Sequence, residues 1–484
     1  YALGDLHAHS DYSDGIQDNP GFTPYDVDTY AMSSHRMDYL GISEHNHYTA
    51  GTRLSNYHLG VTQATNFTTA FPGFVALYGM EWGVISGGGH VLIYGDGMND
   101  LWGWESGSGS WGGSNNYDAF IAKSDYTGAN GLYKTINDNN ASNTFATMAH
   151  PNSSDFGNLS NIAYSAIADA AITGTAVESG PSTSTNTTYS NPGSSMSYLA
   201  YYKKLLSKGY HIGPSIDHDN HNTTFGRTTY SRTAVVAPVK TKTEIIKGFR
   251  NIHFYATQDC DSKVDFTLNT KIMGSSVVAA GAPVISVNLT DATTSTAAAV
   301  IKLMYGIPGS NVNAVEINSA VGSTLTYVDN DLANLATGYY YIDITNGSSR
   351  VITAPVWYTR LDNGVLPVTF GIFTAQKLNK AVRLNWTTEQ EINSSHFIVE
   401  RSADGRNWKA IATVGAAGSS SNHLEYVAYD NLPLNGTGYY RIKQVDNNNK
   451  LQVSVVRNVR FDADYMITVA PNPARDVVTI TMDK

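Results

Sequence analysis

The first half of the chain alternates short apolar or β-branched runs with stretches of helical periodicity. Residues 25–37 and 129–136 have the spacing of helices, and strand-like runs follow them at 39–43 and 144–149. A last amphipathic helix is predicted at 241–250. Strands that alternate with helices in this way favour an α/β layout with parallel strands, in which functional residues follow the strand ends.

The second half consists of shorter alternating strands separated by turn residues. Runs such as 264–268 and 284–289 begin this pattern, and it resumes near residue 368. Strands spaced in this way are typical of β-sandwiches. Roughly 150 residues per domain predict about three domains for 484 residues. The pattern places them at 1–262, 263–365 and 366–463, and 464–484 is predicted to be the truncated start of a fourth module.

Charged residues are scarce, at 15% of the chain, so Asn, Ser, Thr, Gly and Tyr supply most of its polarity. The 31 basic and 41 acidic residues leave a net charge of −10, which argues against broad capture of nucleic acid or of an anionic membrane. No apolar run reaches the roughly 18 residues that a membrane span needs. Because the sequence begins at Tyr1 without Met, we expect a secreted protein after removal of a signal peptide, with a truncated chain as the alternative.

The single cysteine, Cys260, excludes an internal disulfide and a thiolate cluster. A metal site would therefore need nitrogen and oxygen ligands from His, Asp and Glu. The histidines are unevenly distributed, since 12 of the 14 lie at or before His253. The first half of the chain is thus the expected place for such a site.

The first candidate motif is GDLHAHSDYSDG, in which His7 and His9 stand two residues apart after an apolar run. The two-residue period of a strand places both imidazoles on one side. Asp14 adds an oxygen ligand at a turn that Gly15 permits. A single such motif is weak evidence, because histidines are commonly hydrogen-bonded or exposed without binding metal.

Four further motifs follow predicted strands in the same half of the chain. Their candidate residues are Glu44 and His45 in GISEHN, Glu81 in LYGMEWG with His90 in GGGHVLIYG, His150 in TFATMAHPN, and Asp219 and His221 in SIDHDNH. Each motif alone is equally explained by a histidine that is hydrogen-bonded or exposed without binding metal. The shared position of the motifs at strand ends favours one common metal site.

The order of these motifs resembles that of the polymerase and histidinol phosphatase (PHP) superfamily of metallohydrolases, over roughly residues 1–260. The resemblance implies a distorted β/α barrel of seven parallel strands with metals at their carboxyl ends. We therefore expect a multidomain chain of α/β plus all-β domains. A distorted (β/α)7 barrel would be followed by two β-sandwiches, the first immunoglobulin-like and the second fibronectin type III-like.

The resemblance also implies a ligand set. One pair of metals would be bound by His7, His9, Glu81 and Asp219. Either Asp14 or His221, together with His45, would complete the binding of this pair. A further metal would be bound by His90 and His150. Glu44 stands where the family more often has Asp, so we expect it to support a ligand rather than to bind metal. Asp217 and His218 form a competing pair, which we expect to orient ligands because only Asp219 and His221 have the DxH spacing.

Nine nitrogen and oxygen ligands suit two or three divalent ions of Zn, Mn or Fe rather than one tetrahedral ion. Such ions can hold a bridging hydroxide for attack at phosphorus, with Glu81 as the bridging carboxylate. His150 or His218 would protonate the leaving alkoxide. Arg227 and Arg232 would orient phosphate oxygens, although arginines exposed on a surface loop are an equally good explanation.

Two other regions have candidate roles. The segment DLWGWESGSGSWGG, with Trp102, Trp104 and Trp111, could form an aromatic lid over the site, but packing on the rim of the domain is the favoured interpretation. Residues 366–461 resemble the fibronectin-type sandwich that precedes sorting domains of type IX bacterial secretion, and APNPARDVVTITM is similar to the start of such a sorting domain. We expect the sandwiches to be spacers rather than binding modules.

The leading hypothesis is a secreted, metal-dependent phosphoesterase that hydrolyses phosphomonoesters or small phosphodiesters. A PHP-type hydrolase of carbamate, ester or amide bonds is the alternative, because motifs alone do not separate phosphorus from carbonyl chemistry. A non-catalytic surface-binding protein is the alternative of another class. The expected partner is a small phosphorylated substrate, without a stable nucleic-acid complex, and the secretion pathway would allow attachment to the cell surface.

Overall fold

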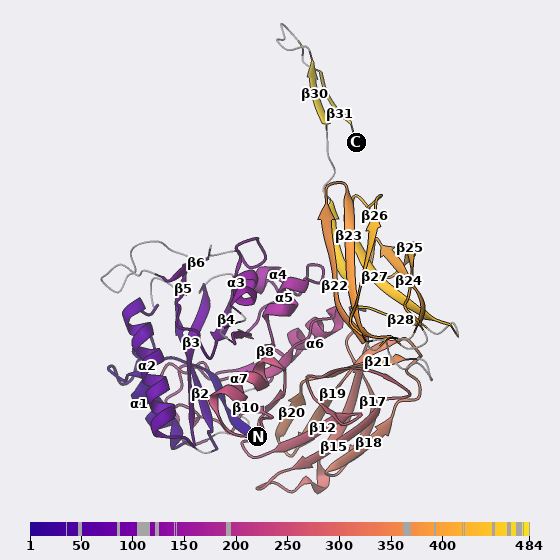
Figure 1. Cartoon of the computed structure of the whole chain (residues 1–484). Coiled ribbons are helices and arrows are strands. Elements are labelled where there is room, and N and C mark those ends of the chain that lie inside the picture. The colour runs from indigo at the N-terminus through magenta and orange to yellow at the C-terminus, as the bar shows by residue number, and fades with distance from the viewer. Residues whose placement is uncertain are drawn as a thin grey trace. The chain divides into compact units, whose positions relative to one another are not determined.

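The computed structural model places 44% of the chain in strands and 16% in helices, so the protein is mostly β. It describes all residues except 35, 47–50, 85–87, 104–116, 122–124, 140, 142, 190–194, 362–368, 392–393, 419, 421, 448–450, 462–465, 471–476, 478 and 484. The chain forms two compact units (Figure 1). Unit 1 comprises Tyr1–Val278 and Ala282–Thr359, and unit 2 comprises Ala279–Gly281 and Arg360–Lys484.

Unit 1 is built on one long mixed sheet that curls in its N-terminal part. Along this sheet the strands follow the order β11-β10-β1-β2-β3-β4-β7-β8-β9. Their bounds are β1 (Ala2–Ala8), β2 (Tyr39–His45), β3 (Val75–Val84), β4 (Gly89–Tyr94), β7 (Phe145–Ala149), β8 (Gly174–Ser179), β9 (Gly213–Asp217), β10 (Arg232–Val235) and β11 (Phe254–Thr257), and β5 (Trp102–Gly103) pairs with β6 (Ala119–Phe120) in a separate ribbon.

Seven helices accompany these strands in the described part of unit 1. They are α1 (Pro24–Met32), α2 (Leu54–Ala70), α3 (Leu132–Asp138), α4 (Asp155–Asn158), α5 (Ala166–Ala171), α6 (Leu199–Lys208) and α7 (Lys242–Arg250). None of the helices among the described residues is long and apolar enough to cross a membrane.

The predicted (β/α)7 barrel is wrong. Strands β1, β2 and β3 are parallel neighbours, as are β7, β8 and β9, but β4 runs antiparallel to both β3 and β7. The physical reason lies in the connection from Val84 to Gly89, which is too short for the crossover helix that a parallel pair needs. Strand β10 is likewise antiparallel to β1 and to β11. The sequence pattern showed strands and helices in alternation but not the direction of each strand.

Helix α7 packs its buried face against strands of the curled sheet. Thr241 caps its first turn by accepting a hydrogen bond from the Glu244 amide. The ring of Phe249 then packs against three strands, with centroid distances of 4.9 Å to Phe145 and 5.0 Å to Phe254. Its third contact, at 5.9 Å, is the ring of Tyr39 on β2. This packing holds together strands that are far apart in the sequence.

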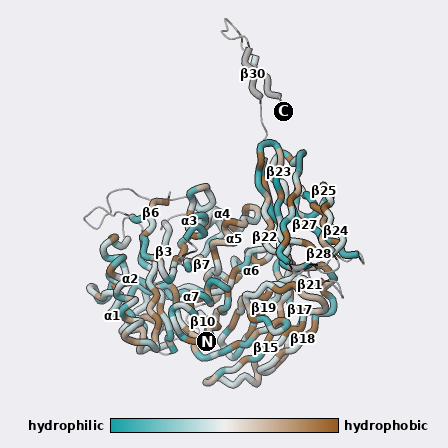
Figure 2. Tube along the Cα trace, in the orientation of Figure 1, coloured by the Kyte–Doolittle hydropathy of each residue, from teal (hydrophilic) through white to brown (hydrophobic). Residues whose placement is uncertain are grey.

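The same sheet continues into the rest of unit 1. Strand β11 pairs antiparallel with β20, so the N-terminal sheet runs into a sandwich. That sheet also contains β14 (Ser276–Ala280), β16 (Val300–Gly306), β17 (Val315–Val321), β19 (Thr337–Asn346), β20 (Ser349–Thr353) and β21 (Val356–Leu361). The facing sheet has the order β13-β12-β15-β18, with bounds Lys271–Ile272, Lys263–Leu268, Val284–Thr290 and Thr324–Val328. In β15 every second residue is buried, and Figure 2 shows the matching alternation of hydropathy.

Unit 2 contains a β-sandwich of two sheets, as the sequence predicted. One sheet consists of β22 (Thr369–Leu378), β23 (Ala381–Gln390) and β26 (Leu424–Asp430). The other consists of β24 (Ser394–Ser402), β25 (Lys409–Gly415), β27 (Gly436–Asp446), β28 (Leu451–Val453) and β29 (Arg457–Phe461). Trp386 of the first sheet and Phe397 of the second meet in the core, with ring centroids 5.5 Å apart. Strands β30 (Met466–Ala470) and β31 (Thr479–Asp483) form a hairpin of their own.

We predict that Phe249→Ala destabilises unit 1 by about 3–5 kcal/mol, because it removes a buried ring that contacts three strands. Chemical denaturation followed by tryptophan fluorescence would measure the loss. Lys247→Ala on the same helix is the control, since its side chain is 62% exposed and should change the free energy of unfolding by less than about 0.5 kcal/mol. Equal effects of the two substitutions would contradict the packing role of Phe249.

Candidate metal centre

The register of the strands brings the predicted ligands together. His7 lies in β1 and His9 follows directly after it. Across the parallel pair β2–β3, His45 is the Cα partner of Glu81. Strand β4 then begins near His90, whose partner on β7 is Ala149, the residue before His150. The antiparallel pairing of β3 with β4, which is incompatible with the predicted barrel, therefore places His90 at the same end of the sheet as Glu81.

The last two ligands reach the site through a loop that docks beside β1. The His9 amide donates to the Asn220 carbonyl at 3.0 Å, which places Asp219 and His221 on either side of this bond. Asp219 has φ 55° and His150 has φ 27°. Residues other than glycine rarely adopt positive φ, and such strain is concentrated at functional sites. The backbone is thus held in costly conformations at two of the predicted ligands.

One group of four ligands surrounds a common point. His7 Nε2 lies 3.0 Å from Glu81 Oε2 and 3.1 Å from Asp219 Oδ1. His9 Nε2 lies 3.2 Å and 3.3 Å from the same two oxygens. Ligands that share one ion at about 2.1 Å are separated by roughly 3–3.5 Å, as here. His7 Nε2 and Glu81 Oε2 are buried and make no hydrogen bond to any described residue, so these four residues fit a cation.

A second group consists of His45, Asp14 and His221, with His9 shared from the first. Asp14 Oδ1 lies 3.5 Å from His45 Nε2 and 3.8 Å from His221 Nε2. The ring of His9 stacks on that of His45 at 4.3 Å and meets that of His221 at 4.4 Å. Candidate ligand atoms of all four residues lie within 4.8 Å of one another, which is compatible with a second ion.

The third group uses the other oxygen of Glu81. His90 Nδ1 lies 2.5 Å and His150 Nε2 lies 3.3 Å from Glu81 Oε1. His45 Nδ1 approaches Oε2 at 3.1 Å. The carboxylate of Glu81, 1% exposed, is therefore within 3.3 Å of imidazoles from five histidines, the remaining two being His7 and His9. This is the arrangement of a bridging carboxylate.

The electrostatics of the cluster indicate that it needs positive charge. Burial opposes ionisation of Glu81, but His7, His90 and His45 outweigh it and hold the pKa of Glu81 well below its usual range. Burial also opposes protonation of His9, yet Asp219 and Glu81 raise its pKa to about 10. The carboxylates are thus held ionised by protonated imidazoles, and divalent cations would take the place of those protons.

Carboxylates behind the ligands orient them. Asp217 Oδ2 lies 3.7 Å from His7 Nδ1, on the side of the ring opposite the cluster. Asp5 accepts hydrogen bonds from the backbone amides of His7 and His218, and burial, with the nearby Asp217, raises the pKa of Asp5 to about 8. Glu44 accepts hydrogen bonds from the Ser10 and Ser13 hydroxyls.

Glu44 thereby holds the loop between His9 and Asp14, the role expected of a supporting residue. Burial raises the pKa of Glu44 to about 7, although the serine hydrogen bonds oppose the shift. Such supporting contacts fix the direction in which a ligand atom points.

Three residues with predicted catalytic roles lie away from the described walls of the cavity. His218 is buried, its Nε2 donates to the Ser231 carbonyl at 2.9 Å, and burial lowers its pKa to about 3. Arg232 is fully buried and donates to backbone carbonyls, among them Gly226 at 2.7 Å. Arg227 donates to the Ser33 hydroxyl at 2.5 Å and lies over the Tyr30 ring. The structure brings the nine metal-ligand candidates together but not these three side chains.

The tryptophan-rich segment is described only at Trp102. This residue is buried in β5, and its carbonyl accepts a hydrogen bond from the Asn46 side chain at 2.8 Å. Trp104 and Trp111 lie outside the described residues.

A cavity of about 450 Å³ opens onto the ligands. Its described walls also include Ser179, Gly180, Ser182 and Tyr198, which the sequence interpretation missed. Ser179 is the last residue of β8. Its place at a strand end was a signal in the sequence, because functional residues of α/β folds often lie there. Tyr198 comes just before α6 and had no such signal. Burial, then the charges of Asp219 and Asp217, raise the pKa of Tyr198, which keeps the phenol protonated.

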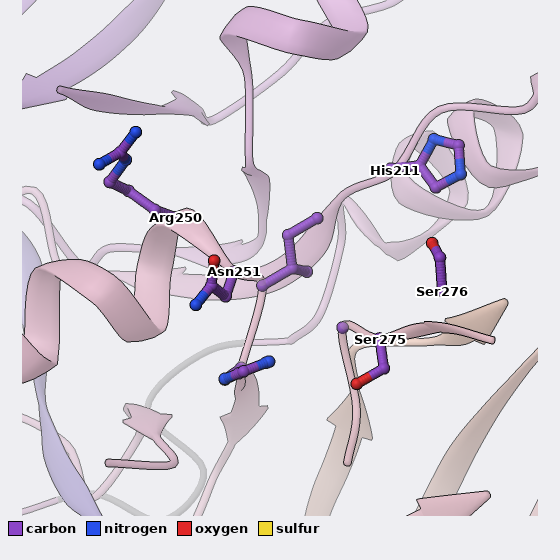
Figure 3. A pocket seen from close by; sticks show the side chains of 8 residues that line it. His211, Arg250, Asn251, Ser275 and Ser276 are labelled. Atoms are coloured by element: carbon purple, nitrogen blue, oxygen red, sulfur yellow. The ribbon is translucent and has the colours of Figure 1, made fainter. Parts of the chain in front are cut away.

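A second cavity, of about 340 Å³, lies elsewhere in unit 1. Figure 3 shows Arg250 and His211 on opposite sides of it, with Ser275 and Ser276 lower in the view on the side of His211. His211 Nδ1 is bound to Asp169 at 2.9 Å and Arg250 donates to Asn143. These side chains are engaged with protein partners, so the cavity is a weaker candidate than the one at the ligands.

Another set of carboxylates, Asp259, Asp261 and Asp291, is also close enough together to hold an ion. Protein groups already approach it: Arg36 Nη2 lies 3.6 Å from Asp261, and Asp291 accepts a hydrogen bond from Ser262 at 3.0 Å. The histidine-containing cluster remains the stronger metal site.

No family model matches the sequence, and no curated protein matches it. Solved structures that match include the FN1–FN3 domains of chicken CNTN1, at 9% identity over 39% of this chain and 68% of that chain, with a TM-score of 0.17. The fibronectin(III)-like modules of Clostridium thermocellum CbhA match at 15% identity over 40% of this chain and 91% of that chain, with a TM-score of 0.15. Scores this low carry no argument, and the sandwich in unit 2 rests on its own two sheets.

We predict that the affinity for Zn²⁺ or Mn²⁺ rises steeply from about pH 6 to about pH 8.5. His9 binds metal only after losing a proton, and its raised pKa means that the metal-free cluster retains protons throughout this range. Competition with a chelator at each pH, after correction for the chelator's own protonation, would measure the dependence. An affinity that stays constant or falls with pH would contradict ligation by these imidazoles.

Proposed function

We propose that the protein is a metal-dependent hydrolase of phosphate esters, acting on phosphomonoesters or small phosphodiesters. The observation that carries this proposal is the Glu81 carboxylate, whose two oxygens face different histidine groups within 3.3 Å. Metals on both sides of one carboxylate lie close enough to act on the same substrate. The proposed cofactors are two or three divalent ions of Zn, Mn or Fe.

Ions held there would lower the pKa of a bound water molecule and offset the charge that develops at phosphorus. The protein contributes the geometry. Asp5 fixes the backbone of His7, Asp217 lies behind the His7 imidazole, and Glu44 fixes the loop that carries Asp14. The buried ligands allow little rearrangement when substrate binds, and preorganised groups of this kind supply much of an enzyme's rate enhancement.

The order and type of the ligands support a relationship to the PHP superfamily, and we propose it on the ligand set alone. The mixed sheet does not contribute to this argument, because it lacks the seven parallel strands. Secretion, followed by release or by attachment at the cell surface, is proposed from the similarity of APNPARDVVTITM to a sorting domain.

Hydrolysis of a carbamate, ester or amide is a second candidate, favoured by one observation. Among the described residues that line the cavity, none is Lys or Arg. Bound metals would then supply the positive charge for a phosphate, whereas a neutral carbonyl substrate needs less of it. Measured turnover of phosphate and carbonyl substrates would decide between these two functions.

We expect the purified protein to hydrolyse 4-nitrophenyl phosphate or bis(4-nitrophenyl) phosphate faster than a naphthyl carbamate at equal concentration. Product release after reconstitution with Zn²⁺, Mn²⁺ or Fe²⁺ would be compared with that of the chelator-treated protein. Turnover of the carbamate alone would replace the phosphoesterase proposal by the carbonyl one. Less than one metal per chain, together with no turnover, would favour a non-catalytic surface-binding protein.

We expect Glu81→Gln to abolish turnover and to lower the metal content by at least one ion per chain, because Gln lacks the charge that bridges the histidine groups. Since a cluster acts as a unit, a loss of at least about 1000-fold in kcat is expected. His7→Ala should behave similarly. The control is His58→Ala on α2, an exposed histidine paired with Asp118. Full activity of Glu81→Gln would rule out this site.

A further inference from the structure

Tyr198 stands at the wall of the metal-site cavity with its backbone fixed. Its amide donates to the Val177 carbonyl at 3.1 Å, and its own carbonyl accepts from the amides of Tyr201 and Tyr202 as α6 begins. The ring is half-buried and lines the same cavity as Asp219 and His221. The residue is therefore anchored to β8 and α6 while its side chain faces the place where a substrate would bind.

The hydroxyl of Tyr198 makes no hydrogen bond to any residue that the structure describes, in contrast to many other tyrosines of unit 1. Tyr94, Tyr126 and Tyr133, for example, donate to backbone carbonyls. A phenol is a good hydrogen-bond donor and stays protonated at neutral pH. The Tyr198 hydroxyl is therefore available to donate a hydrogen bond to a substrate bound beside the candidate metal ligands.

The other candidate proton donors are occupied. His150 Nε2 faces Glu81 as a metal ligand would, so this nitrogen has no proton to donate once an ion is bound. His218 donates to the Ser231 carbonyl and is buried behind the cluster. Apart from the candidate ligands, the protic side chains on the described cavity wall are Ser179, Ser182 and Tyr198, and the phenol is by far the strongest acid of the three.

We propose that Tyr198 is a catalytic residue that donates its phenolic proton to the leaving-group oxygen. This inference rests on the proposed hydrolysis and names the group that completes it. Water oxygen forms the new bond to phosphorus as the bond to the leaving oxygen breaks, and the electron pair of that bond stays on the leaving oxygen. The Tyr198 proton moves to this oxygen, the attacking water loses its proton to solvent, and solvent returns a proton to the phenolate.

The proposal makes a prediction about the kind of leaving group. A leaving alkoxide is a stronger base than a phenolate and needs the proton of Tyr198, whereas a nitrophenolate is a weak base and departs without it. Tyr198→Phe keeps the ring and removes only the hydroxyl. We expect it to lower kcat about 100-fold or more for an ethyl ester and less than about threefold for the matching nitrophenyl ester.

The experiment uses the full chain and a series of nitrophenyl, phenyl and ethyl esters of whichever class the wild-type protein hydrolyses. Metal content and thermal denaturation are measured for each variant and should equal those of the wild type. Tyr201→Phe is the matched control, because it removes a hydroxyl from α6 that is buried and makes no hydrogen bond within the described part of the chain. This variant should retain wild-type rates on all three esters.

An equal loss on all three esters, no loss on any, or a loss of metal in Tyr198→Phe would overturn the role of Tyr198. These outcomes leave the hydrolase proposal in place, because the wild type is still active. A wild-type protein that binds metal but hydrolyses no ester would instead overturn the proposed function, and the inference about Tyr198 with it.

Discussion

The site depends on one constraint: the Glu81 carboxylate is held ionised although it is almost completely buried. An isolated buried carboxylate would be protonated, because the cost of desolvating its charge exceeds what a few hydrogen bonds return. Here His7, His90 and His45 outweigh that cost and hold the pKa low. The strained backbones of Asp219 and His150 are a further cost of the same arrangement. Strained and desolvated groups of this kind are concentrated at functional sites. Divalent cations at this position would offset the cost of burying the Glu81 charge.

The sequence identified the candidate ligands that the structure brings together far better than it identified the fold around them. A ligand is recognised by its residue type and its place after a strand, and both are local properties; His7, His45 and Glu81 were found in this way. The direction of a strand depends on pairing between distant segments. For this reason alternating elements suggested a barrel, while the short connection before His90 produced an antiparallel hairpin.

Two further features lay beyond sequence reasoning for the same reason. The pairing of β11 with β20 joins the N-terminal sheet to the following sandwich, and no local pattern marks it. The positions of Arg227 and Arg232 were equally hidden, because an arginine near a motif can face the site or be held by carbonyls, as Arg232 is. Tyr198 illustrates the converse, since a residue without any motif lines the cavity.

The central claim is that the histidine and carboxylate groups hold two or more ions bridged by Glu81. A crystal structure of the protein grown with Mn²⁺ or Zn²⁺, with data collected at the metal absorption edge, tests it directly. The account predicts at least two anomalous peaks, one on each side of the Glu81 carboxylate, each about 2.0–2.3 Å from nitrogen or oxygen atoms of His7, His9, His90 or Asp219. Peaks found only elsewhere, or an occupied site in which Glu81 contacts no metal, would contradict it.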